Sequence, residues 1–165
     1  MFESYNGLAR RALFFARHAA SQSGCPAIET EHLLLGLVRE GGPLVARLVP
    51  TVSLEELRVR IPRKIVDENP APRMHMPLTT ECKRILGYSA EEANGLDHGY
   101  IGVEHLLLGL LREKACRAAL VLSELGVHLE ELRRRLVQVS PQSTATKAES
   151  TVVKGTFSSG ASMSD

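Results

Sequence analysis

EHLLLGLVRE, residues 31–40, returns almost unchanged as EHLLLGLLRE, residues 104–113, with nine of ten positions identical at an offset of 73 residues. The match extends to both sides of this stretch. Upstream, Arg10 aligns with Lys83 at the same offset, and downstream LEELRVR (54–60) aligns with LEELRRR (129–135) at an offset of 75. The chain therefore contains an internal duplication. Repeats this short usually share one core, because neither half buries enough surface alone.

Each copy has the apolar spacing of four helices, so we expect an all-α domain of eight helices with pseudo-two-fold symmetry. Asn6, Thr30, Ser53 and Thr79 are residue types that accept hydrogen bonds at helix N-termini. In the first repeat we expect one helix over residues 6–23 and three more that begin near residues 30, 43 and 53. In the second repeat the helices are expected over residues 79–95, 103–114, 116–125 and 128–139. Glycines 36 and 109 lie inside the two central helices, where we expect them to allow close approach across the interface between the repeats.

The two repeats are expected to form one domain, with the first over residues 1–61 and the second over residues 78–139. Residues 62–77 hold four prolines and have the pattern of an irregular linker. Residues 140–165 are rich in Ser, Thr, Gly and Ala. They contain too few apolar side chains to offset the entropy lost on ordering, so we expect a disordered C-terminal tail.

Composition argues against several classes of function. Among 165 residues, 20 are Lys or Arg and 19 are Asp or Glu, whereas a general nucleic-acid binder has a basic excess. No apolar run approaches the ~20 residues that span a bilayer, and MFESYNGLARR lacks the apolar region of a secretory signal. We therefore expect a cytoplasmic protein with three reduced, mostly buried cysteines. No Cys–His cluster has metal-site spacing, so neither a metal nor another cofactor is expected.

The paired stretches resemble the Clp N-terminal domain, the double Clp repeat at the head of ClpC/ClpA-type AAA+ unfoldases. The family pattern G-H-x-x-[IV]-G-T-E-H-[IL]-L-L-G-L-[IV]-R-E appears as GCPAIETEHLLLGLVRE (24–40) and DHGYIGVEHLLLGLLRE (97–113). The resemblance covers about residues 1–139 and implies an eight-helix domain that delivers substrate proteins and adaptors to the ATPase ring. The sequence departs from the family pattern at Asn6, Cys25, Glu29, Asp97 and Val103.

The resemblance also implies a ligand pocket in each repeat. Glu31 and Glu104 stand at the starts of the central helices, and in the family the matching Glu reads the guanidinium of phosphorylated arginine. A nearby helix N-terminus with its capping residue receives the phosphate. We pair Glu104 with Thr79 and Glu31 with Asn6. The alternative is that both carboxylates only complement the helix dipole.

Phe2, Arg10 and Lys83 form a second candidate site, because the family receives adaptors and peptides around the matching positions. The alternative is a hydrophobic staple beside two solvated basic side chains. His32 and His105 are expected to be packed or hydrogen-bonded structural residues. The Arg–Glu pairs at 39–40 and 112–113 are likewise expected to be structural.

The leading hypothesis is a non-enzymatic protein-binding domain that recognises Clp substrates or adaptors, phosphoarginine-marked proteins among them, and modulates Clp-dependent proteolysis. No G-x-x-x-x-G-K-[ST] loop occurs, so the motor of an unfoldase is missing from this sequence, and a Clp ATPase or protease is a candidate partner. The alternative is a helical regulatory or DNA-associated module with the same fold, against which the near-zero net charge argues. A Cys–His hydrolase is disfavoured, since the sequence has no nucleophile elbow or paired acids. Neither nucleic acid nor a membrane is expected as a partner.

Overall fold

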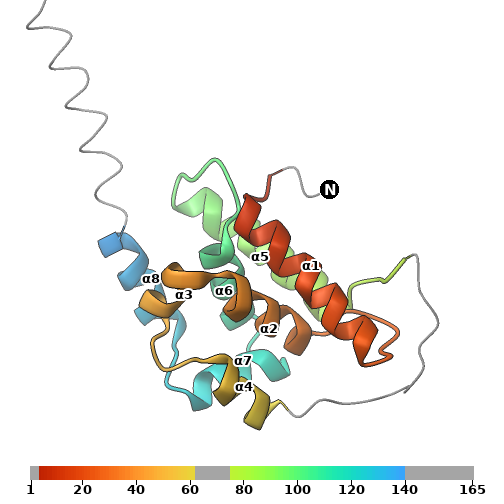
Figure 1. The fold of residues 1–165 in the computed structure, drawn as a ribbon. Helices are drawn as coiled ribbons and strands as arrows, with labels where there is room; N and C mark the ends of the chain where they lie inside the picture. The colour runs from red at the N-terminus through yellow and green to blue at the C-terminus, as the bar shows by residue number, and fades with distance from the viewer. Residues whose placement is uncertain (1–3, 62–74, 140–165) are drawn as a thin grey trace, which may run out of the picture.

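The computed structural model describes residues 4–61 and 75–139, which form eight helices (Figure 1). In chain order they are α1 (Gly7–Gln22), α2 (Thr30–Glu40), α3 (Gly42–Leu48), α4 (Leu54–Arg60), α5 (Thr80–Gly95), α6 (Val103–Arg112), α7 (Arg117–Glu124) and α8 (Leu129–Val139). The predicted all-α fold of two four-helix repeats is confirmed. The predicted tail, residues 62–74 of the predicted linker, and Phe2 lie outside the described residues.

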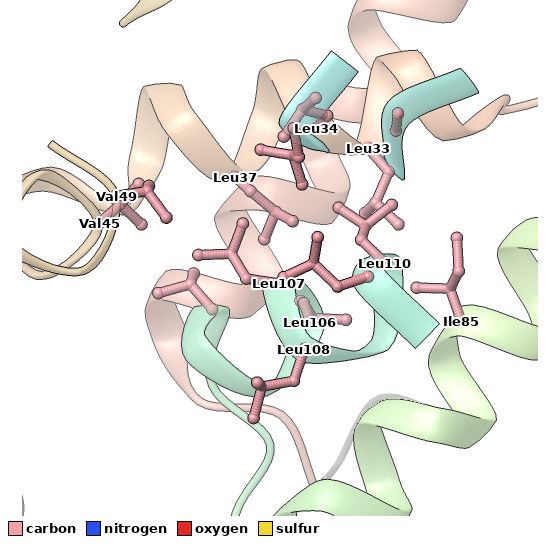
Figure 2. Packing of buried hydrophobic residues seen from close by; sticks show 14 of the residues in the cluster. Leu33, Leu34, Leu37, Val45, Val49, Ile85, Leu106, Leu107, Leu108 and Leu110 are labelled. Carbon is pink, nitrogen blue, oxygen red and sulfur yellow. The ribbon is translucent and has the colours of Figure 1, made fainter. Parts of the chain in front are cut away.

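The centre of the domain is formed by α2 and α6, the two copies of the repeated stretch. Helix α1 packs along α2, and α5 packs along α6. Leucines of α2 and α6 meet in one cluster (Figure 2), in which Leu33, Leu37, Leu107 and Leu110 are fully buried. Burial of one leucine side chain stabilises the fold by about 1.5–3 kcal/mol. The repeated sequence therefore forms the core that the two copies share.

Gly36 and Gly109 allow close helix approach within each repeat. A Cβ added at Gly36 would lie 2.2 Å from the carbonyl oxygen of Ala12 in α1. A Cβ added at Gly109 would lie 2.6 Å from the carbonyl oxygen of Ile85 in α5. The prediction that these glycines serve the interface between the repeats is wrong, because the faces of α2 and α6 that meet there carry leucines instead.

Side-chain caps begin most helices where the sequence predicts them. Asn6, Ser53 and Thr79 each accept a hydrogen bond from the backbone N–H three residues on, at 2.9, 3.1 and 3.3 Å. Thr30 is the exception: it was predicted to cap α2, but it is the first helical residue, and the N-cap is Glu29. The backbone N–H of Glu29 donates to His32 Nδ1 at 3.1 Å, so the histidine three residues on satisfies this backbone group.

The Arg–Glu pairs that end the two repeated stretches contact the preceding helix of the same repeat, which is α1 in the first repeat and α5 in the second. The contacts are Arg39 over the Phe15 ring at 3.9 Å, Arg112 over the Tyr88 ring at 4.4 Å, Arg11 with Glu40 at 3.5 Å, and Arg84 with Glu113 at 2.9 Å. The two partners on α1, Arg11 and Phe15, correspond to Arg84 and Tyr88 on α5, each at the offset of 73 residues. The structural interpretation of these pairs is therefore confirmed.

None of the helices within the two described ranges combines the length and the apolar character needed to cross a bilayer. The three cysteines are buried, and none forms a disulfide. Burial raises the pKa of the Cys82 thiol to about 11 and also raises that of Cys116. Both side chains are therefore neutral thiols near neutral pH.

Candidate functional site

A groove of about 620 Å³ lies between the outer face of α1 and the segment that leads into α5. It is lined by Arg10, Leu13, Phe14, Arg17, Ile28, His75, Met76, Pro77, Leu78 and Lys83. The α1 residues fall at positions i, i+3, i+4 and i+7 and so share one side of the helix. The opposite side of α1 carries the buried alanines that pack into the domain.

The second wall of the groove is held in place by backbone pairing between the repeats. The backbone N–H of Ile28 donates to the carbonyl of Pro77 at 2.8 Å, and the N–H of Thr79 donates to the carbonyl of Ile28 at 3.1 Å. These bonds place residues 75–78 beside the end of the α1–α2 connection. Met76 is buried there, in contact with the core, although the sequence pattern assigned it to an irregular linker.

The groove is lined by apolar side chains and by exposed basic ones. Phe14 is 65% exposed, and it is the one residue of the described lining among the large apolar side chains that are exposed. Arg10, Arg17 and Lys83 are exposed, and the described lining contains no Asp or Glu. The site therefore offers apolar contact together with positive charge.

The structure brings Arg10 and Lys83 of the predicted partner surface to this one groove. Sequence reasoning missed Phe14, Arg17 and the residues around Met76. A signal for Phe14 was present: it follows Leu13 on the side of α1 opposite the alanine stripe, where a core residue is not expected. No comparable signal marks Met76, whose place depends on pairing with Ile28.

The glutamate pockets are paired differently from the prediction. The N–H of Asn6 donates to the carbonyl of Ile101 at 3.0 Å, so the start of α1 lies beside the start of α6 and Glu104. Thr79 is bonded to Ile28 in the same way, so the start of α5 lies beside the start of α2 and Glu31. The pairing of Glu104 with Thr79 and of Glu31 with Asn6 is therefore wrong, because each helix start pairs with the other repeat.

The two glutamates have different surroundings. Glu31 accepts a hydrogen bond from the Thr30 hydroxyl at 3.1 Å and lies 3.8 Å from the Arg117 guanidinium. Glu104 is buried, and its Oε2 has no hydrogen-bond partner among the described residues. Burial, and then the Glu104 carboxylate beside it, raise the pKa of Tyr100.

The absence of a side chain at Gly102 explains how the Glu104 carboxylate is accommodated. A Cβ at Gly102 would lie 2.3 Å from Glu104 Oε2, so the carboxylate occupies the space that a side chain would need. In the first repeat the equivalent position is Glu29, the N-cap residue of α2. Glu31 and Glu104 thus stand at equivalent positions in the first turns of α2 and α6, but among the described residues only Glu104 has a buried carboxylate oxygen without a hydrogen-bond partner.

His98, Glu104 and His105 lie close enough together to suggest a metal site, but the hydrogen bonds of the histidines argue against one. His105 Nδ1 accepts from the N–H of Gly102 at 2.8 Å, so its proton is on Nε2, which lies 2.8 Å from His98 Nδ1. The His105 ring therefore has no lone pair left for a cation. His32 Nδ1 accepts from the N–H of Glu29 in the same manner at 3.1 Å. Both histidines are structural, as predicted.

Known proteins with this architecture are related to the chain by sequence. The family model described as Clp repeat (R) N-terminal domain matches residues 77–162, more than half of the chain. The chaperone protein ClpC2, chloroplastic, of Oryza sativa subsp. japonica is 36% identical over 146 residues, which are 87% of this chain and 16% of that protein. The chaperone protein ClpB of Oceanobacillus iheyensis is 36% identical over 140 residues, 84% of this chain and 17% of that protein. The chain thus spans about a sixth of the length of these relatives.

Solved structures agree with the sequence relatives. The N-terminal domain of the chaperone ClpD from Arabidopsis thaliana has a TM-score of 0.67 and 25% identity, over 84% of this chain and 95% of that one. The Hsp104 N-terminal domain from Candida albicans shares the fold, with a TM-score of 0.64 and 15% identity over 84% and 93% of the two chains. On the match of the family model and these relatives, the chain belongs to the Clp repeat N-terminal domain family.

Proposed function

We propose that this chain is a protein-binding domain that takes a peptide segment of a client or adaptor protein into the groove between α1 and residues 75–83, and so modulates proteolysis by a Clp unfoldase. The observation that carries the proposal is the exposed Phe14 side chain in a groove whose other apolar lining residues include Leu13, Ile28, Met76 and Leu78. A concave site lined mostly by apolar side chains, with a few polar groups, is the usual form of a binding pocket. The groove volume is also within the range of ligand sites.

The chemistry of the lining favours binding over catalysis. Its described residues include no carboxylate, serine or cysteine, so the groove presents neither paired acids nor an activated hydroxyl or thiol. The relatives include Clp chaperones that are about six times as long as this chain. Most of this chain matches about a sixth of each of them. We therefore propose a recognition role without a reaction of its own.

Titration with fluorescent apolar peptides tests the binding step. Phe14→Ser removes the central apolar contact of the groove, and we expect affinity to fall at least fivefold. Val59→Ser is the matched control, because Val59 is 81% exposed on α4, outside the groove lining. Equal affinities for the two variants, or no binding by the unmodified chain, would refute the proposal.

A degradation assay tests the regulatory step. The chain is added to a Clp unfoldase–protease that degrades a fluorescent client, and the rate is followed against chain concentration. We expect the rate to change with the unmodified chain and to stay unchanged with Phe14→Ser. A rate that responds equally to both chains would show that the groove plays no part in the effect.

We infer a second candidate activity at Glu104, the recognition of a phosphoarginine-type ligand. A buried carboxylate oxygen without a partner is costly, and a guanidinium that donates two hydrogen bonds is its natural complement. The start of α1 at Asn6 lies beside this carboxylate and offers backbone N–H groups to an anion.

Titration of the chain with phosphoarginine tests this second candidate. We expect Glu104→Gln to abolish binding, since an amide keeps the shape of the carboxylate but loses the charge that attracts a guanidinium. Glu40→Gln serves as the control, because Glu40 is an acid that pairs with Arg11 elsewhere on the surface. Unchanged binding by Glu104→Gln would exclude the pocket.

A further inference from the structure

Residue 102, directly before the first residue of α6, is a glycine although its backbone does not require one. Gly102 has φ −104° and ψ −179°, an extended conformation that any residue adopts. Its counterpart in the first repeat, Glu29, has nearly the same backbone, with φ −93° and ψ 168°. Both positions therefore admit a side chain as far as the backbone is concerned, and the reason for a glycine has to lie in its neighbours.

The space beside Gly102 is filled by the carboxylate of Glu104. A Cβ added at residue 102 would lie 2.3 Å from Oε2 of this carboxylate and 2.7 Å from Oε1, both well inside van der Waals contact. The Glu104 side chain is only 7% exposed, and its Oε2 has no hydrogen-bond partner among the described residues. A side chain at residue 102 and the buried carboxylate of Glu104 therefore exclude each other.

The first repeat shows where the carboxylate lies when that position carries a side chain. Because the equivalent residue is Glu29, the Glu31 carboxylate cannot occupy the space that Glu104 occupies in the second repeat. The Glu31 side chain is instead 20% exposed, accepts a hydrogen bond from the Thr30 hydroxyl at 3.1 Å, and lies 3.8 Å from the Arg117 guanidinium. The same helix start thus has two carboxylate positions, a buried one beside glycine and a more exposed one beside a larger residue.

We propose that Gly102 is a positioning residue of the Glu104 pocket, which keeps the carboxylate in the buried position where it recognises a guanidinium, an inference that rests on the phosphoarginine-type recognition proposed above. The buried position matters for affinity. Ion pairs that are exposed to water contribute little, whereas a charged hydrogen bond to a desolvated carboxylate contributes more.

An alanine at residue 102 should move the carboxylate rather than disrupt the fold. The atoms that its Cβ would meet are the far end of the flexible Glu104 side chain, whereas a Cβ at Gly109 would meet the backbone of another helix. Rotation of the carboxylate towards solvent also gives water to an oxygen that has no partner in the buried position. Alanine further reduces the conformational freedom of the unfolded chain. We therefore expect ligand recognition to be lost without a loss of stability.

Gly102→Ala and Gly99→Ala form a matched pair that tests the proposal. Gly99 is exposed in the same connection between α5 and α6, and a Cβ there meets nothing within 4 Å. By isothermal titration calorimetry with phosphoarginine, we expect Gly102→Ala to bind about tenfold more weakly than the unmodified chain, and Gly99→Ala to bind equally well. The urea midpoint of Gly102→Ala should be no lower than that of the unmodified chain.

The carboxyl carbon resonance of Glu104 reports the position of the carboxylate in the absence of ligand. It can be assigned by its disappearance in Glu104→Gln. We expect this resonance to shift in Gly102→Ala, because the carboxylate passes from a buried site into water, and to stay unchanged in Gly99→Ala. A glycine needed only for the fold would not produce this difference at constant stability.

The outcomes separate this proposal from the recognition of phosphoarginine itself. Unchanged affinity in Gly102→Ala overturns the positioning role and leaves Glu104 as a binding residue. Weaker binding with an unmoved Glu104 resonance also overturns it, because the alanine would then block the ligand directly. Weaker binding together with a lower urea midpoint assigns the glycine to the fold instead. No binding of phosphoarginine by the unmodified chain overturns both proposals.

Discussion

At the scale of single residues, Gly109 shows how little space separates α6 from α5. Because a Cβ there would lie 2.4 Å from the Ser89 hydroxyl and 2.6 Å from a backbone carbonyl, Gly109→Ala must push the helices apart. Overpacking of this kind costs 1–3 kcal/mol, more than the ~1 kcal/mol of helix propensity that alanine gains. We expect the free energy of unfolding in urea to fall by about 1 kcal/mol, the difference between these two effects.

Gly87 provides the control for that substitution. It lies within α5, but a Cβ added there meets nothing within 4 Å. Gly87→Ala therefore gains helix propensity without a clash, and we expect it to stabilise the domain by about 0.5–1 kcal/mol. If both alanine variants were equally stable, close packing at Gly109 would not be what requires glycine.

His105 makes the stability of the domain depend on pH. Burial, and then the neighbouring His98, lower the pKa of His105 to about 4, whereas the unfolded chain protonates near 6.5. Between these values the unfolded state binds more protons than the folded state, so stability falls as the pH falls from about 6.5 towards 4. Urea unfolding at pH 7 and pH 4.5 should show a loss on the order of 3 kcal/mol from this residue.

His105→Gln isolates that contribution from the titration of carboxylates. Glutamine at the same helix position can still accept from the N-cap backbone but does not titrate, so the loss at pH 4.5 should be smaller in this variant. His128→Gln, at an exposed position before α8, should retain the loss of the unmodified chain. An identical pH dependence in all three proteins would contradict the assignment to His105.

At the scale of helices, Glu92 joins three elements. From α5 it lies 3.3 Å from Arg112 of α6 and 2.6 Å from Arg133 of α8, with its side chain only 10% exposed. We expect Glu92→Ala to lower the free energy of unfolding by about 1 kcal/mol, since both arginines remain partly solvated. Hydrogen exchange should accelerate in α8, which the pair with Arg133 holds to the domain.

Glu91 is the neighbouring control on the same helix. It also pairs with Arg112, at 2.6 Å, but its side chain is 64% exposed and does not reach α8. Glu91→Ala should change the free energy of unfolding by less than 0.5 kcal/mol and leave exchange in α8 unaffected. Equal effects of the two variants would mean that the link to α8 adds nothing.

At the scale of the whole molecule, sequence reasoning succeeded where the signal was local. The helices and the caps at Asn6, Ser53 and Thr79 follow from side chains within a few residues of one another. The duplication predicted the shared core of Leu33 and Leu107, because a repeated apolar helix has to be buried somewhere.

The errors concern contacts between distant segments. Which helix lies against Gly36, and which repeat supplies the capping residue beside Glu104, depend on how the two copies dock. Arg10 and Lys83 were assigned to one surface through family resemblance, but the groove also needs residues 75–78, which pair with Ile28 across the chain. Local patterns carry no information about such pairings.

Glu31 and Glu104 occupy equivalent positions in the two repeats, but within the described ranges only Glu31 has a guanidinium of the chain nearby. Glu31 has Arg117 from α7 at 3.8 Å, whereas the counterpart helix α3, which packs against α6, begins with Gly42 and Pro43 and brings no cation to Glu104. If the domain binds phosphoarginine, the first pocket is already in contact with a guanidinium of the chain itself. We therefore predict one bound phosphoarginine per chain by isothermal titration calorimetry, although the fold contains two related pockets.

Substitution at Arg117 tests whether that contact is the reason. Arg117→Gln leaves Glu31 without its guanidinium, so a second phosphoarginine should bind, and the stoichiometry should rise from one to two. Arg47→Gln removes a charge at an exposed position on α3 and should leave the stoichiometry at one. Two equivalent sites in the unmodified chain would contradict the prediction. The contact between Glu31 and the Arg117 side chain, which is 58% exposed, would then be too weak to exclude a ligand.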